Sequence, residues 1–305
     1  MEEAKYGIGV DIGGTKIAAG LVNLGNGKLY NSEVIPTNRH RSTEAIIEDL
    51  KNLVQGQLKA ALASGQNVEL CGLAFPELVN NQGQIVSDWN FDLKHLREED
   101  FPISRVLFDS DVRVAGLAEA RFGAGKSFHS FVYISLGTGL SYSLFIDGKP
   151  WRGANGYAIH FASSPLSGLC PHCSELSSFV AEEQVSGSGL ASSWQLATGE
   201  PYPGGVPAML KAAQSADGPE RAHIHAASQC LGGLVAQIVN MLDPDGIVIG
   251  GGLGVAGGIY QELTIQAIRE RIWAEDCKSI PIQFAHFGNT AGIIGAALSP
   301  LESNR

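Results

Sequence analysis

The chain has 305 residues, of which 44% are hydrophobic and 38 are glycine. This length predicts two domains, each large enough to bury a core, and the composition is typical of a soluble α/β enzyme with many tight turns. Acidic residues outnumber basic ones by 31 to 21, which gives a net charge of −10. We expect no nucleic-acid partner, because the sequence has no run of basic residues to neutralise phosphates.

The N-terminal residues lack the pattern of a secretory leader, and Asp11 interrupts the first apolar stretch. No apolar run is long enough to cross a bilayer, so we expect no membrane partner. The five cysteines are an odd number and widely spread, which favours a reducing compartment over a disulfide framework. We therefore expect a cytoplasmic protein.

An apolar strand, a tight glycine turn and a second apolar strand open the chain over residues 6–22. The adjacent Gly13 and Gly14 would let backbone N–H groups approach a bound anion, since no Cβ is in the way. Asp11, at the mouth of this turn, would repel a phosphate alone. It is well placed if a divalent cation lies between the carboxylate and the phosphate. The turn therefore predicts a phosphate loop that acts with a metal ion.

The next part of the chain predicts a helix over 43–63 and a buried strand over 68–75, followed by a turn at 80–83. A short strand over 105–108 leads through Asp109, Ser110 and Asp111 into a helix over 112–122. Asp111 is suited to cap this helix. Asp111 also lies between the first phosphate loop and a second one at residues 137–139. This place suits a carboxylate that accepts the proton of an attacking hydroxyl.

A second strand–turn–strand unit covers residues 131–145 and carries Gly137, Thr138 and Gly139 in its turn. Two such loops suggest a duplicated domain that grips one nucleotide from both sides. The segment 153–189 is rich in Gly, Ser, Cys and Pro, and we expect it to be irregular. Later elements are expected in the following order: a helix over 218–242, a strand over 246–249, a helix over 259–273, a strand over 282–285 and a closing helix from 291.

Gly250, Gly251 and Gly252 follow the strand at 246–249, where a backbone without side chains would admit adenosine or phosphate. The run from Gly252 to Gly257 also matches the dinucleotide fingerprint G-x-G-x-x-G, which would suit a dehydrogenase. Too little chain follows it for the rest of a dinucleotide domain. Alternation of strands and helices favours two mostly parallel, helix-flanked sheets.

Cys170 and Cys173 have a spacing suited to zinc, but a structural site needs four ligands and no third cysteine follows nearby. A structural Zn²⁺ and a pair of metal-free loop cysteines both stay open.

Six motifs together resemble those of the sugar kinases of the ROK family (repressor, open reading frame, kinase), within the actin/hexokinase-like superfamily. They are Asp11–Lys16, Gly72–Pro76, Asp109–Asp111, Leu136–Gly139, Leu242–Gly252 and Ala291–Ala297. The resemblance implies a duplicated α/β, ribonuclease H-like fold of two domains with an interdomain cleft. The expected N-terminal domain is 1–115 plus a closing helix at 290–305, and the expected nucleotide and dimerisation domain is 116–289.

Kinases of this family transfer the γ-phosphate of ATP to a primary hydroxyl, usually of a hexose. By this resemblance Asp111 matches the catalytic base, and Asp11 matches the residue near Mg²⁺, which it would contact through water. The family likeness favours a homodimer. The expected ATP- and phosphate-binding residues are Asp11, Gly13, Gly14, Thr15, Lys16, Gly137, Thr138, Gly139, Gly250, Gly251 and Gly252.

The sequence departs from the family pattern at residues that would bind the sugar or the zinc ion. The glutamate that grips sugar hydroxyls becomes His160, the zinc-binding histidine becomes Ser163, and the family's Pro-Gly becomes Pro76-Glu77. A later sugar-binding glutamate matches Glu182 or Glu183. The expected substrate-binding residues are Glu77, Asn90, Ser110, Asp111, His160, Ser163, Glu182 and Glu183.

Because the nucleotide motifs are kept while the sugar side is changed, we hypothesise a substrate other than glucose. It would be a C7-cyclitol of the valiolone type, or an amino sugar whose ammonium group meets Glu77. A broad or weak glucokinase and a non-catalytic sugar sensor with the same fold are the alternatives.

Overall fold

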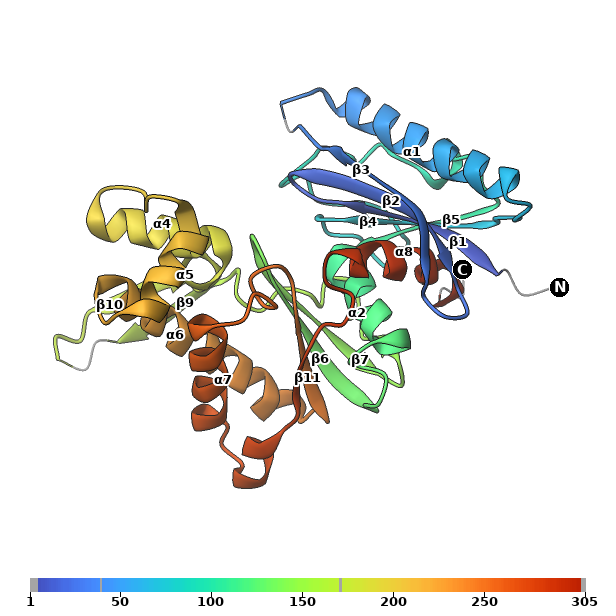
Figure 1. Cartoon of the computed structure of the whole chain (residues 1–305). Coiled ribbons are helices and arrows are strands. Elements are labelled where there is room, and N and C mark those ends of the chain that lie inside the picture. Colours follow the sequence, from blue (N-terminus) through green and yellow to red (C-terminus); the bar gives the residue numbers. More distant parts are fainter. Residues whose placement is uncertain (1–4, 39, 170–171, 303–305) are drawn as a thin grey trace. The chain divides into compact units, whose positions relative to one another are not determined.

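The computed structural model describes residues 5–38, 40–169 and 172–302. The chain is mixed α/β (Figure 1) and divides into two compact units. Unit 1 comprises residues 1–129, 143–159 and 289–305, and unit 2 comprises residues 130–142 and 160–288. The expected domain boundary between residues 115 and 116 stays a prediction.

Unit 1 contains a five-stranded sheet in the order β3-β2-β1-β4-β5. The first three strands form an antiparallel meander, whereas β4 and β5 run parallel to β1. The sheet is mixed rather than mostly parallel because strands joined by tight turns pair antiparallel. The strands are β1 (Tyr6–Ile12), β2 (Lys16–Asn23), β3 (Leu29–Pro36), β4 (Leu70–Phe75) and β5 (Arg105–Ser110).

Helices cover both faces of this sheet: α1 (Thr43–Ala63) lies on one face, and α2 (Asp111–Phe122) and α8 (Ala291–Glu302) lie on the other (Figure 1). The predicted helix at 43–63 is confirmed, and Ser42 caps it by accepting a hydrogen bond from the Ala45 N–H. Small residues let α8 pack closely on β1 and β4, and Ala291–Pro300 are all buried.

A second sheet has the order β12-β11-β6-β7-β8. Strand β11 pairs parallel with both β6 and β12, while β7 and β8 pair antiparallel. The strands are β6 (Ser130–Leu136), β7 (Leu140–Ile146), β8 (Lys149–Pro150), β11 (Gly246–Gly250) and β12 (Ile282–Phe284).

Two long helices of unit 2, α6 (Pro219–Leu242) and α7 (Ile259–Arg271), pack against each other. They confirm the helices predicted at 218–242 and 259–273, although α7 ends two residues earlier. The remaining short helices are α3 (Glu182–Val185), α4 (Gly187–Thr198), α5 (Gly205–Ser215), η1 (Glu98–Asp100), η2 (Glu275–Ser279) and η3 (Gly288–Thr290).

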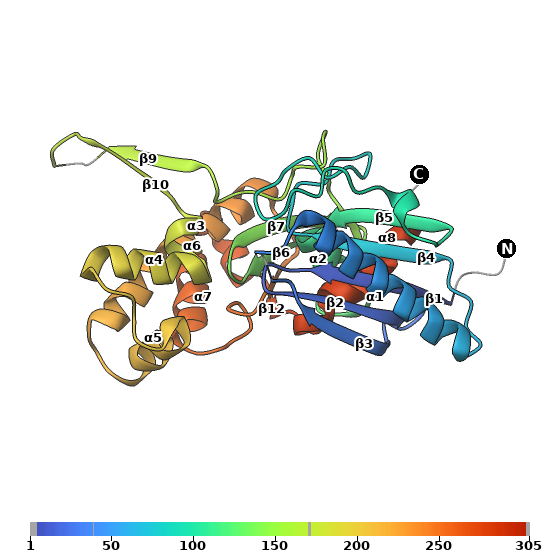
Figure 2. The same cartoon turned by 90° about the horizontal axis from the view of Figure 1, so that it is seen from above.

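The segment 153–189 is not irregular throughout, so that expectation is partly wrong. Strands β9 (Pro165–Leu169) and β10 (Leu176–Val180) form an antiparallel two-stranded ribbon (Figure 2). Almost every residue in the ribbon is exposed. Because neither face is buried, the sequence carries no clear alternation of apolar and polar residues there.

No helix in the described part of the chain is both long enough and apolar enough to cross a bilayer.

Candidate functional site

The first glycine turn joins β1 to β2 in unit 1. The Gly13 N–H donates to the Lys16 carbonyl at 2.9 Å, which closes the turn. Thr37 supports it from the end of β3, because its Oγ1 donates to the Gly13 carbonyl at 2.6 Å and its N–H to the Thr15 carbonyl at 3.0 Å. Thr37 is fully buried, and the sequence analysis did not single it out. Thr15 and Lys16 are exposed.

Asp11 lies near the end of β1, directly before this turn, and is half-buried. Burial and, to a smaller extent, the charge of Asp111 raise its pKa to about 7, while Lys16 opposes the shift. The first turn of α8 lies against the carboxylate: a Cβ on Gly292 would collide with the Asp11 oxygens and displace the carboxylate. A desolvated carboxylate beside a second one suits a divalent cation, which takes oxygen ligands and relieves the repulsion.

Asp111 is the first residue of α2, and its Oδ1 accepts hydrogen bonds from the Val112 N–H at 2.7 Å and from the Ser110 hydroxyl at 3.4 Å. Ser110, not Asp111, occupies the N-cap position. Burial raises the pKa of Asp111 to about 6; the two hydrogen bonds and Arg113 oppose the shift, and Glu77 adds to it. A carboxylate with this pKa is ionised at neutral pH yet is a better proton acceptor than an ordinary aspartate.

Glu77 lies just after β4 and is only 2% exposed. Its Oε2 accepts hydrogen bonds from the Ser87 hydroxyl and from the Trp89 N–H at 3.1 Å. Its Oε1 accepts from the N–H groups of Asn90 at 2.6 Å and Phe91 at 3.0 Å. Both oxygens are therefore engaged by the chain itself. This arrangement does not support a direct contact between Glu77 and a substrate ammonium group.

An ion cluster at the junction of β5 and α2 was not anticipated from the sequence. Asp109 pairs with the fully buried Arg113 at 2.6 Å and with Arg152 at 2.6 Å. Burial would raise the pKa of Asp109, but the two guanidinium groups hold it below its usual value. Arg113 also donates to the carbonyls of Gly156 at 2.6 Å and Val79 at 3.0 Å. The only feature of the sequence that could have indicated the ion pair is the four-residue spacing of Asp109 and Arg113.

The second glycine turn joins β6 to β7, and the start of α4 packs on it. The Gly137 N–H donates to the Gly139 carbonyl at 3.0 Å, and the Gly187 N–H donates to the Gly137 carbonyl at 2.8 Å. Ser188 binds the Thr138 carbonyl through both its N–H at 3.1 Å and its hydroxyl at 2.7 Å. Gly187 and Ser188 thus fix the shape of this turn.

The glycines after β11 are tied to the end of β6. The N–H groups of Leu253 and Gly254 donate to the Leu136 carbonyl at 3.1 and 2.9 Å. Gly251 has a φ of +80°, and a Cβ there would collide with the Leu136 carbonyl. Only glycine fits this position, for both reasons.

A cavity of about 830 Å³ in unit 2 brings these two glycine segments together. Gly137, Thr138 and Gly252 lie in its wall, whereas Gly139, Gly250 and Gly251 are not among its lining residues. The volume is within the range of small-molecule sites. Helices α4 and α5 and the start of α7 supply a further part of the wall that the sequence did not predict. These residues are Gly187, Ser188, Val206, Pro207, Leu210, Lys211, Gln214, Gly258 and Ile259.

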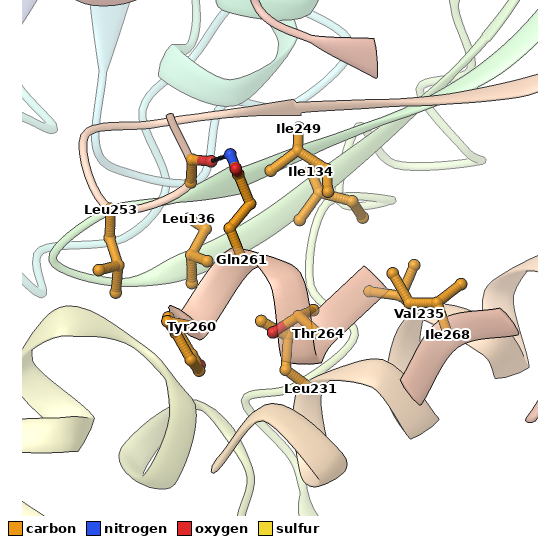
Figure 3. A pocket seen from close by; sticks show the side chains of 11 residues that line it. Ile134, Leu136, Leu231, Val235, Ile249, Leu253, Tyr260, Gln261, Thr264 and Ile268 are labelled. Atoms are coloured by element: carbon orange, nitrogen blue, oxygen red, sulfur yellow. Dashed lines mark hydrogen bonds between the residues drawn. The ribbon is translucent and has the colours of Figure 1, made fainter. Parts of the chain in front are cut away.

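A much smaller cavity, of about 20 Å³, lies behind the same loop, where side chains of α6 and α7 face β6 and β11 (Figure 3). Gln261 crosses it to donate to the Gly254 carbonyl at 2.9 Å. This volume holds about one water molecule, so the cavity is a packing gap beneath the loop and not a ligand site.

His160, Ser163 and Glu182 form a polar cluster in unit 2. The Ser163 hydroxyl donates to Glu182 Oε2 at 2.7 Å and lies 3.3 Å from His160 Nδ1, and the Leu140 N–H donates to Glu182 Oε1 at 2.9 Å. Burial lowers the pKa of His160 against the opposing effect of Glu182. Glu183 is exposed and takes no part in these hydrogen bonds, so Glu182 is the glutamate that joins the cluster.

The predicted zinc pair is described only in part, because Cys170 lies outside the described residues. Cys173 is exposed, and its Sγ donates to Glu175 Oε2 at 3.7 Å. Within residues 5–38, 40–169 and 172–302, no three His, Cys, Asp or Glu side chains gather as a metal site. The structural zinc stays an untested hypothesis.

Sequence comparison matches residues 7–301 to the model of the ROK family. The chain is 29% identical to a glucokinase of Streptomyces coelicolor, over 95% of this chain and 96% of that protein. It is 29% identical to the N-acetylgalactosamine kinase AgaK of a Shewanella species, over 95% of each. It is 26% identical to an N-acetylmannosamine kinase of Escherichia fergusonii, over 95% of this chain and 97% of that one.

Solved structures agree with this assignment. A ROK family glucokinase from Streptomyces griseus, crystallised with glucose and AMPPNP, superposes with a TM-score of 0.79 at 26% identity, covering 98% of this chain and all of that one. A ROK hexokinase from Thermus thermophilus gives the same TM-score and identity over 96% and 97%. The fold is thus the actin/hexokinase-like fold, and the chain belongs to the ROK family.

Proposed function

We propose that this protein is an ATP-dependent carbohydrate kinase that phosphorylates a primary hydroxyl group, with Asp111 as the general base. The observation that carries the proposal is the placement of Asp111: it is the first residue of α2, directly after β5, in the same unit as Asp11 and the first glycine turn, and burial raises its pKa to about 6. Family membership and the kinases among the relatives support the activity.

Each unit would supply part of the machinery. Unit 2 would hold the nucleotide in its 830 Å³ cavity, where Val206, Pro207 and Ile259 offer an apolar wall and Lys211 a cation. Unit 1 would supply the Gly13–Thr15 turn, whose backbone suits a phosphate. Asp11 would hold Mg²⁺ through water, and the ion would neutralise charge on the phosphates when bound.

Asp111 would act on the acceptor. The hydroxyl oxygen forms a bond to the γ-phosphorus as the bond between that phosphorus and the β,γ-bridging oxygen breaks, and the hydroxyl proton passes to the Asp111 carboxylate. The products are a phosphate monoester and ADP. Positioning and charge stabilisation would provide most of the rate enhancement, as in other phosphoryl transfers.

The acceptor class we propose is a hexose, an aminohexose or a C7-cyclitol. The named relatives act on glucose, N-acetylgalactosamine and N-acetylmannosamine, which supports a hexose-like ring. His160 stands where the resemblance expects a sugar-binding glutamate, and it is joined to Ser163 and Glu182. This change supports a substrate that differs from glucose at the groups these residues contact.

An ADP-release assay across hexoses, N-acetylated and free aminohexoses and C7-cyclitols tests the proposal. We expect preferred turnover of one class, and a loss of about 10²–10⁴-fold in kcat for Asp111→Asn with nucleotide binding retained. Equal turnover of every acceptor would favour a broad glucokinase. Acceptor binding without any ADP release would favour the sugar sensor, and full activity of Asp111→Asn would reject the base.

We also propose, from the family likeness, that the protein is a cytoplasmic homodimer, which sedimentation of the purified protein tests for the oligomeric state.

A further inference from the structure

Glu77 stands out because a carboxylate replaces the glycine that the family resemblance expects after Pro76. The charge is buried, with 2% exposure, and it has no salt-bridge partner among the described residues. Four hydrogen bonds stabilise it instead, from Ser87, Trp89, Asn90 and Phe91. Three of the four donors are backbone N–H groups of successive residues, so the carboxylate fixes the path of the backbone.

These donors belong to one arm of a loop, residues 86–91, which we call the acceptor arm. The loop leaves β4 at Pro76 and folds back on itself. The Leu78 N–H donates to the Ser87 hydroxyl at 2.9 Å, and the Val86 N–H donates to the Leu78 carbonyl at 2.9 Å. Asn90 returns to the start of the loop, where its Nδ2 donates to the Pro76 carbonyl at 2.7 Å. Glu77 is thus the centre of the contacts that hold this arm.

The far end of the loop is held by other groups. Arg113 donates to the Val79 carbonyl at 3.0 Å, and Asn81 Nδ2 donates to the carbonyls of Gly153 and Ala154 at 3.0 Å each. These contacts do not involve residues 86–91. Removal of the Glu77 carboxylate would therefore loosen residues 89–91 of the acceptor arm, while the rest of the loop stays anchored.

The acceptor arm lies next to the proposed base. Strands β4 and β5 are parallel neighbours in which Phe75 pairs with Ser110, so Glu77 and Asp111 follow adjacent strand ends in unit 1. The charge of Glu77 also contributes to the raised pKa of Asp111. The arm carries Trp89, which is 65% exposed, and the half-buried Asn90, a predicted substrate-binding residue. A polar and an aromatic side chain are thus carried by a backbone that Glu77 holds at the end of β4, the strand next to the one that leads into Asp111.

We propose that Glu77 is a positioning residue for the phosphoryl acceptor: it does not contact the substrate but holds Trp89 and Asn90 in a preformed acceptor-binding arm. This inference rests on the proposed kinase function. A loop that is already ordered binds its ligand without the entropy cost of ordering, so the carboxylate should favour acceptor binding more than nucleotide binding.

The test compares Glu77→Gln with Glu99→Gln, which changes an exposed acid of unit 1 in the same way. Gln keeps the size of the side chain but places an NH₂ group against backbone donors. For Glu77→Gln we expect the acceptor KM to rise about tenfold, with the ATP KM changed by less than about twofold. Glu99→Gln should match the wild type.

Hydrogen exchange provides a readout that does not depend on turnover. The amides of residues 89–91 should exchange faster in Glu77→Gln, while those of α1 and β1 stay protected. Ser87→Ala removes one of the four donors and is the milder variant in case Glu77→Gln does not fold; we expect a smaller rise in acceptor KM in the same direction.

The outcomes separate this inference from the proposed function. An active wild type whose acceptor KM is unchanged in Glu77→Gln and Ser87→Ala overturns the positioning role alone. Equal increases in both KM values, with faster exchange throughout unit 1, also overturn it, because they indicate general destabilisation. A wild type that phosphorylates no acceptor overturns both.

Discussion

Asp11 and Asp111 lie within electrostatic reach of each other in unit 1, although 100 residues separate them in sequence, and the charge of Asp111 raises the pKa of Asp11. Two desolvated carboxylates that repel each other oppose folding when both are ionised. The site is therefore expected to be less stable without a cation and at higher pH.

Thermal unfolding across pH tests this expectation in the protein without metal or nucleotide. Folding raises the pKa of Asp11 from 3.8 to about 7, so the folded state binds more protons than the unfolded state between these values. The resulting stability is complete below about pH 4 and is lost as the pH rises through about 7. Asp11→Asn removes the ionisable group, so this variant should keep the stability at every pH. Its Tm should therefore exceed that of the wild type by a margin that grows from pH 5 to pH 8.

The control for this comparison is Asp217→Asn, which changes an aspartate whose side chain is 97% exposed. Its unfolding curve should run parallel to that of the wild type. If Asp11→Asn also runs parallel, the repulsion between the two carboxylates has no consequence for stability.

The pH dependence of turnover reports on Asp111. Because the pKa of this carboxyl is raised to about 6, a growing share is protonated below that pH and cannot accept the hydroxyl proton. We expect kcat/KM for the acceptor to rise from pH 5 and level off above about pH 7. Steady-state rates in buffers of constant ionic strength measure this rise in kcat/KM with pH. A profile that is flat down to pH 5 would contradict the assignment.

Substitutions at two neighbouring glycines should separate the effect of backbone strain on stability from the effect of a partly filled cavity on ATP binding. A Cβ at Gly251 meets the Leu136 carbonyl and requires a positive φ, whereas a Cβ at Gly252 meets no protein atom within 4 Å. Gly251→Ala should therefore lower the free energy of unfolding by about 1–3 kcal/mol. Gly252→Ala should fold normally but raise the ATP KM, because Gly252 lines the large cavity. Denaturant titration and ATP kinetics check the two effects, and equal destabilisation would contradict the proposed geometry.

The buried ion cluster predicts a large difference between two arginines of α2. Arg113→Met leaves Asp109 buried with Arg152 as its remaining partner, and we expect a loss of about 3–5 kcal/mol in the free energy of unfolding. Arg121→Met removes an exposed pair with Glu302 and should cost less than about 1 kcal/mol. Chemical denaturation of both variants measures the contrast, and similar losses would show that burial does not set the strength of these pairs.

Local patterns were enough to predict the elements that carry the phosphate turns. The apolar strands around Gly13-Gly14, the helix at 43–63 and the strand before Gly250 each have a short-range signal, and the structure confirms them. Strands β9 and β10 have exposed faces and therefore no such signal. Helix α5, with Lys211 in the wall of the large cavity, lies in a stretch where no helix was predicted.

Glu77 shows a second limit of structure prediction from the sequence alone. From the sequence, this carboxylate in place of the family's glycine is expected to meet a substrate ammonium group. Its hydrogen-bond donors come from residues 87–91, which only the folded loop brings back to it. Sequence identifies the unusual residue, but the tertiary fold decides what it contacts.

The contact between Gly292 and Asp11 has a consequence for biosynthesis. Helix α8, which packs on β1 and β4, is translated almost a whole chain length after those strands. The part of the N-terminal sheet that α8 covers is therefore exposed during translation until α8 has emerged from the ribosome. The packing around Asp11 is therefore completed only after residues 291–302 have been synthesised.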